Sequence, residues 1–224
     1  MNESDWLTSN DPIALLRHVV QSGVVSERKV RLLACACCRQ IWEWLPDPRS
    51  RAAVEVAERF ADEQATPREL ARARNEALAV GGGASWAPYW ATNSKASGPL
   101  RNVFEAAAAA PARAAVQRAT DHRADAWYLQ QSVTLAEQVA LIREVIGNPF
   151  RDVPLDPMWL AYDDGIVVRL AEGIYQDGAF DRMPILGDAL EEAGCAVPEL
   201  LAHCREPAKH VRGCWLLDAL TGRV

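Results

Sequence analysis

The stretch RKVRLLACACCRQIWEWL, residues 28–45, most constrains what this chain can fold into. Its apolar side chains recur every three or four residues and therefore share one face of an α-helix. They are Val30, Leu33, Ala34, Cys37, Cys38, Ile41, Trp42 and Leu45. Ser26 can cap the first turn, and Pro46 stops the helix because proline lacks an amide hydrogen. A helix with so wide an apolar face must be covered by other helices.

Similar patterns predict helices along most of the chain. The predicted helices span about residues 12–21, 48–61, 67–80, 112–146, 166–175, 182–193, 197–204 and 209–220. The longest of them, 112–146, is expected to break once. We therefore predict an all-α protein of seven to ten helices, either an irregular multi-helix bundle or an array of helical hairpins. We expect a single helical domain over residues 1–224, with the cysteine-rich helix central and the C-terminal helices packed on it.

Residues 81–111 differ in character from the rest of the chain. Three consecutive glycines open the segment, and its other residues are mainly alanine, glycine, serine and proline. The only large anchors before Phe104 are Trp86, Tyr89 and Trp90. Because glycine and proline interrupt regular structure, we expect an irregular connection or the tip of a helical hairpin here, with one short helix ending before Pro111.

Charge and hydropathy argue against several classes of function, although they leave room for a local basic patch. The net charge of -6 and the pI near 5.3 argue against nucleic-acid binding, which usually needs a basic surface. No window approaches 18 apolar residues free of charge, so no membrane span is expected. The first residues have neither the basic start nor the apolar run of a signal peptide. We expect a cytoplasmic protein whose six cysteines are thiols or metal ligands, not disulfides.

Five segments of the chain carry a resemblance to a known set of sequences. These are RKVRLLACACCRQIW, RAAVEVAERFAD, NPFRDVPLDPMWL, AEGIYQDGAFDRMPILGDALEEAGC and LLAHCREPAKHVRGCWLLDALTG. Together they resemble a family of planctomycete-type bacterial proteins of unknown function, and the resemblance covers most of the chain outside residues 81–125. It implies a cytoplasmic bacterial protein whose two ends belong to one structural unit, and it assigns no catalytic residue.

The C-terminal third holds the residues best suited to a metal site. Zinc takes four ligands in a tetrahedron, most often thiolates and imidazoles. His210 and Cys214 are four residues apart on a predicted helix and can point the same way, and Pro207 can turn Cys204 back toward them. The predicted ligands are Cys195, Cys204, His210 and Cys214, with His203, Cys37 or Cys38 as other sources of the fourth. The spacing matches no standard zinc finger.

Buried thiols and a thiol enzyme are the competing interpretations of these residues. Free cysteine packs like a small apolar residue, and Cys37 and Cys38 lie in the middle of an apolar stripe. A thiol enzyme needs a base beside the sulfur, but His203 and Cys204 point about 100° apart on a helix. No nucleotide-binding motif is present. We therefore expect a non-catalytic helical module that binds another protein, without a cofactor. The alternative is a zinc-binding protein, with the zinc structural or hydrolytic.

Overall fold

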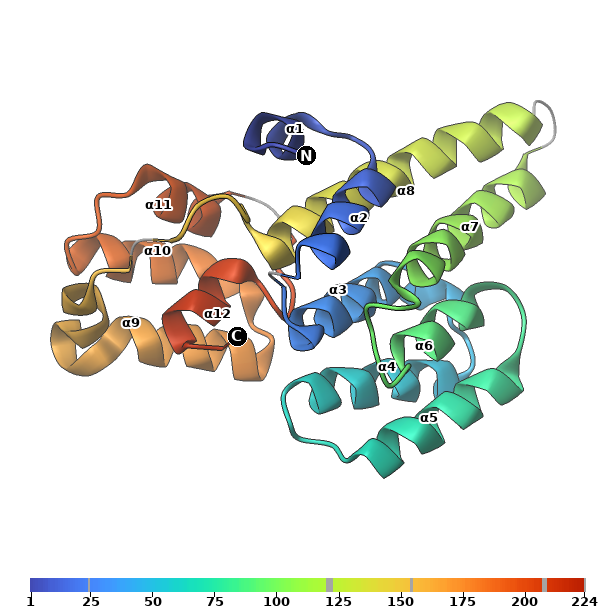
Figure 1. Ribbon diagram of the computed structural model, residues 1–224, viewed down its shortest axis with the longest axis horizontal. Coiled ribbons are helices and arrows are strands. Elements are labelled where there is room, and N and C mark those ends of the chain that lie inside the picture. Colours follow the sequence, from blue (N-terminus) through green and yellow to red (C-terminus); the bar gives the residue numbers. More distant parts are fainter. Residues whose placement is uncertain (24, 120–122, 154, 207–208, 224) are drawn as a thin grey trace. The chain divides into compact units, whose positions relative to one another are not determined.

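The computed structural model describes residues 1–23, 25–119, 123–153, 155–206 and 209–223. Over these residues the chain forms twelve α-helices and three short 3₁₀ helices and no strand (Figure 1), which confirms the all-α class. No helix among them is long and apolar enough to cross a bilayer. The chain divides into two compact units, residues 1–143 and 144–224, a finer division than the single domain expected from the sequence.

The first unit contains the helices from α1 to most of α8. They are α1 (Glu3–Thr8), α2 (Pro12–Ser22), α3 (Glu27–Gln40), η1 (Trp42–Trp44), α4 (Pro48–Ala61), α5 (Pro67–Val80), η2 (Gly83–Ser85), α6 (Trp86–Ala91), α7 (Leu100–Arg118) and α8 (Arg123–Ile146). Local sequence signals set many of their starts. The Asp11 side chain accepts from two first-turn amides of α2, and Thr66 and Glu69 form a capping box at the start of α5.

Helix α3 is the element around which the first unit packs. It contacts α4, α6 and α7, and its apolar face is buried as predicted. Cys35, Cys37 and Cys38 are free thiols in this core. Burial raises the pKa of all three thiols well above the usual range, because a thiolate would lose its hydration. These sulfurs therefore fill space in the core. The predicted packing of the C-terminal helices on α3 stays a prediction.

Residues 81–111 are mostly helical, so the expectation of an irregular connection was wrong for this segment. Trp86, Tyr89 and Trp90 stack edge to face and anchor η2 and α6. Pro111 lies inside α7 instead of ending it. Alanine has the highest helix propensity of any residue type, and the alanine run before Pro111 outweighs the loss of one amide donor.

Two charged residues one turn apart on α3 hold the loop that comes after α6. The Arg31 guanidinium is almost fully buried and donates to the carbonyls of Ala91, Asn93 and Ser94 at 3.0, 2.7 and 3.1 Å. Glu27 accepts from the backbone amide of Ala96 at 2.8 Å. The loop carbonyls are thereby paired with a positive side chain, and a loop amide with a negative one, both from the same helix.

The second unit is built from shorter helices around a core of its own. They are α9 (Pro157–Asp177), η3 (Phe180–Arg182), α10 (Met183–Glu192), α11 (Pro198–Arg205) and α12 (Trp215–Thr221). Helix α9 is interrupted by non-helical residues 162–165. Helix α9 contacts α10 and α12, and α10 contacts α11. Gly187 permits the last contact, because a Cβ there would lie 2.9 Å from the Cβ of Cys204.

Replacing Arg31 with leucine should destabilise the protein by about 3 kcal/mol, because three loop carbonyls lose charged donors in a buried place. Chemical denaturation monitored by circular dichroism measures this. Arg17→Leu is the control, since Arg17 is an exposed arginine on α2, and its effect should stay within about 0.5 kcal/mol. Equal effects of the two substitutions would contradict the role given to Arg31.

The thiols of Cys35, Cys37 and Cys38 should resist iodoacetamide at pH 8 in the native protein, because they are buried and their pKa values are raised. Mass spectrometry of labelled peptides should show modification of all three only after unfolding in guanidinium. Rapid native labelling of this helix would show that its sulfurs are not in the core.

Candidate metal centre

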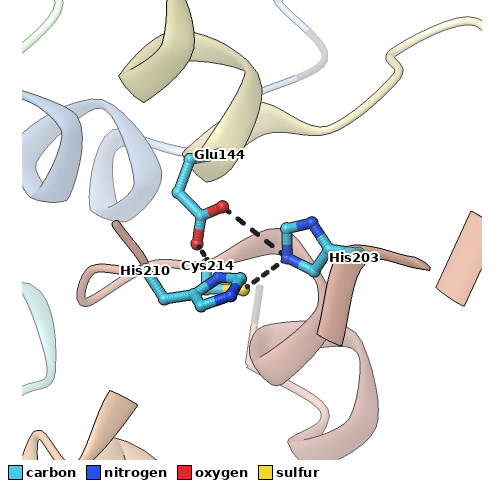
Figure 2. A group of neighbouring side chains, drawn as sticks. All are labelled: Glu144, His203, His210 and Cys214. Atoms are coloured by element: carbon cyan, nitrogen blue, oxygen red, sulfur yellow. Dashed lines mark hydrogen bonds and ion pairs between the residues drawn. The ribbon is translucent and has the colours of Figure 1, made fainter. Parts of the chain in front are cut away.

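Four side chains of the second unit converge on one point: Glu144, His203, His210 and Cys214 (Figure 2). One potential ligand atom from each lies within 4.8 Å of the others. All four side chains are largely withdrawn from solvent, with 14% of His203 exposed and less of the rest. A buried group of this composition has the residue types that bind transition metals.

The four side chains come from three places in the second unit. Glu144 lies in the last turn of α8, and His203 lies near the C-terminal end of α11. His210 precedes α12, and Cys214 is the residue directly before its first turn. Figure 2 shows the Glu144 carboxylate reaching down toward both imidazoles, with the Cys214 sulfur beside them. The site therefore joins a helix end to the α11–α12 segment.

The distances between these groups are those of hydrogen bonds and close ion pairs. Glu144 Oε1 lies 3.1 Å from His210 Nδ1, and Glu144 Oε2 lies 3.6 Å from His203 Nε2. His203 Nε2 lies 3.2 Å from Cys214 Sγ. Tetrahedral bonds of about 2.0–2.3 Å to a zinc ion would place neighbouring ligand atoms about 3.3–3.6 Å apart. Only small side-chain shifts would be needed to bring these groups onto one ion.

The Trp215 side chain packs between the site and Gly147. Its ring lies 4.7 Å from the His203 ring, measured between centroids. A Cβ on Gly147 would lie 3.0 Å from Cγ of Trp215, and Gly147 has a φ of +70°, where a side chain is strained. Gly147 therefore lets the chain after Glu144 pass close to the start of α12. This contact positions the carboxylate relative to His203 and Cys214.

Burial sets the protonation of two of the groups. It lowers the pKa of His203 to about 4, so this imidazole is neutral at pH 7 and has a lone pair for a metal. Burial, and then the nearby Glu144 carboxylate, raise the pKa of Cys214 well above its usual range. Hydrogen bonds from the amides of Leu217 and Leu216 to the sulfur oppose this rise in pKa. A metal ion would add the positive charge that a Cys214 thiolate needs.

One nitrogen of the site is left without a partner. His210 Nε2 is buried, and within the described part of the chain it makes no hydrogen bond. An unpaired polar atom in a protein interior costs about 1–3 kcal/mol. A ligand bound to Nε2 itself would remove that cost, whereas a ligand on Nδ1, the atom that faces Glu144, would not. The site therefore holds one buried nitrogen that no described residue satisfies.

The structure brings together two of the four ligands predicted from the sequence. His210 and Cys214 are in the group, and so is His203, one of the alternatives for the fourth ligand. Cys195 and Cys204 are buried thiols outside it, and burial raises the pKa of Cys204 to about 12. The last helix begins at Trp215 and not near residue 209, so the i, i+4 argument for His210 and Cys214 was wrong although the pair does meet.

Sequence reasoning missed Glu144 altogether. In the sequence it is one charged residue of a long helix, and no local spacing connects it with a histidine far along the chain. One signal was present, because Glu144 lies between Ile142 and Val145, which the helical pattern places on or beside the buried face. A carboxylate among buried positions of a helix needs a partner, and in this chain the partners are imidazoles.

Comparison with known proteins adds no relative. No protein-family model, no curated protein and no solved structure matches this chain. The resemblance to a planctomycete-type bacterial family therefore stays a prediction.

Proposed function

We propose that this protein binds one zinc ion through Glu144, His203, His210 and Cys214. The observation that carries the proposal is the convergence of these four groups in a buried place. Their donor set is two imidazoles, one sulfur and one carboxylate, all of which are zinc ligands, and four is the usual number. Calcium and magnesium prefer six or more oxygen ligands, which the group does not supply.

Charge balance also supports a divalent ion. A carboxylate and a thiolate carry two negative charges, and two neutral imidazoles add none. A divalent ion would therefore make the whole centre neutral, whereas a monovalent ion would leave a net charge in the protein interior. Because an unbalanced buried charge is costly, the set favours a divalent ion such as zinc.

A structural ion fits the group better than a hydrolytic one. Catalytic zinc keeps a coordination position open for water or substrate, and structural zinc is closed by four protein ligands. Four ligand groups are present here, and the most exposed of them, His203, shows only 14% of its side chain to solvent. We therefore propose that the ion cross-links Glu144 to the α11–α12 segment and performs no reaction.

The helical interaction module expected from the sequence stays a second proposal. It is supported by large apolar side chains on α8 that face solvent, namely Tyr128, Leu129 and Val133, exposed by 68%, 70% and 47%. Contiguous exposed apolar side chains are typical of protein-binding surfaces. The expected cytoplasmic location and the expected lack of nucleic-acid partners also stay predictions.

Protein purified without a metal-affinity column should contain about one zinc per chain, because the site has one complete set of four ligands. Inductively coupled plasma mass spectrometry on gel-filtered protein measures this. Cobalt substitution should give the intense visible bands of a tetrahedral ion and a near-ultraviolet thiolate-to-cobalt band. Protein that neither carries nor takes up zinc or cobalt would contradict the proposal.

Cys214→Ala should lower zinc affinity by at least about 100-fold, since even outer-shell changes cost 10–100-fold. Cys195→Ala and Cys204→Ala are matched controls, because they remove buried thiols of the same unit that lie outside the group. Competition with a chromophoric chelator measures the affinities. The thiolate-to-cobalt band should vanish in the first variant alone. Loss of zinc from either control at the same level would show that the ligand is wrongly assigned.

Glu144→Gln should also weaken zinc binding by about 100-fold or more, because the amide keeps the shape of the side chain but loses its charge. Glu137→Gln is the control, since Glu137 is an exposed glutamate on the same helix. If both variants bind zinc as the parent chain does, Glu144 is not a ligand.

A further inference from the structure

The second unit has an apolar core that does not consist of metal ligands. Its buried side chains come from α9, α10, α11 and α12 and from the segments that precede α11 and α12, and among the four ligand groups only Cys214 belongs to it. Large members include Ile174, Tyr175, Met183 and Leu217. Zinc fingers unfold without metal because they lack such a core. Residues 144–224 are roughly twice the ~40 residues below which domains usually need metals or disulfides.

The ligand groups also satisfy one another. His210 Nδ1 pairs with Glu144 Oε1, and His203 Nε2 pairs with Cys214 Sγ. If an ion left, these two contacts would keep most of the buried polar atoms hydrogen-bonded, and His210 Nε2 would be the atom without a partner. The site can therefore exchange coordination bonds for hydrogen bonds at a modest cost.

The ligand set makes the ion easier to release than from a cysteine-rich site. Only one of the four ligands is a soft thiolate, whereas structural zinc sites generally have two to four. His203 is the most exposed member at 14%, compared with 7% for Glu144 and 4% for His210. Detachment of an ion would begin at this imidazole, which solvent or a competing ligand can reach.

From these observations we propose that the zinc is exchangeable and that its occupancy regulates the second unit. The unit folds around its own core without the ion. Zinc binding then fixes His203, His210 and Cys214 to Glu144, so that α11 and α12 become more rigid when zinc is abundant. This inference rests on the proposed function, because it requires the same four groups to bind zinc.

Chelation of the zinc-loaded full chain tests the inference. EDTA under native conditions should remove the ion without denaturant, and the stripped protein should still unfold cooperatively. Its midpoint should lie on the order of 10 °C below that of protein with excess zinc, and added zinc should restore it. Hydrogen exchange should become faster in α11 and α12 after stripping, while the buried amides of α9 and α10 keep their protection.

A matched variant separates ion binding from other effects of the chelator. At a zinc concentration that just saturates the parent chain, Cys214→Ala should show almost the same midpoint with EDTA and with zinc, whereas Cys195→Ala should respond as the parent chain does. A stripped protein without a cooperative transition, or loss of protection throughout α9 to α12, would overturn the inference and make the ion obligatory for folding. Zinc that leaves only upon denaturation would also overturn it. A chain that takes up no zinc would overturn the proposed function as well.

Discussion

A carboxylate removed from water must be given donors or positive charge, and in the second unit Glu144 is the residue with this requirement. Its two oxygens lie near His210 and His203, and the Cys214 sulfur completes the group. Because burial disfavours charge on both the His203 imidazole and the Cys214 thiol, these neighbours do not neutralise Glu144 in the way an arginine would. A divalent ion would correct this imbalance at one point.

The first unit has the opposite requirement, because it buries a positive charge, and it compensates that charge without a metal ion. Arg31 is a buried cation, and three backbone carbonyls of one loop accept hydrogen bonds from it. Partial charges on the loop therefore replace the water that Arg31 gives up. The two units thus show two ways of keeping charged groups inside a helical protein. One uses neutral dipoles that the fold already contains, and the other assembles groups that together suit a metal.

Local periodicity predicted much of the fold. The buried face of α3 results directly from residues spaced three and four apart, and the caps of α2 and α5 depend on one or two side chains each. Prediction failed in residues 81–111, where Pro111 looked like a stop. The stacking of Trp86 and Tyr89 and the propensity of the alanine run decided the outcome there. Such competition between signals cannot be judged from spacing alone.

The candidate site was predictable only in part, for a related reason. His210 and Cys214 stand close together in the sequence, so their proximity could be anticipated even though the helix assigned to them was wrong. Glu144 joins them through tertiary packing, which leaves no local pattern. The six thiols look alike in the sequence, yet Cys37 fills a core and Cys214 faces two ionisable groups. The environment of a cysteine, and not its residue type, decides whether its sulfur only packs or is placed where it could bind a metal.

The packing of Trp215 against Gly147 has a consequence for how the protein can evolve. No side chain fits at Gly147 without displacing the indole, and the indole in turn contacts His203. Gly147, which has no side chain, is thus tied by its packing to the group of Glu144, His203, His210 and Cys214. Among natural variants that keep the four-residue group, position 147 should vary as little as the four residues themselves. In variants that have lost the group, both position 147 and these four positions should vary freely.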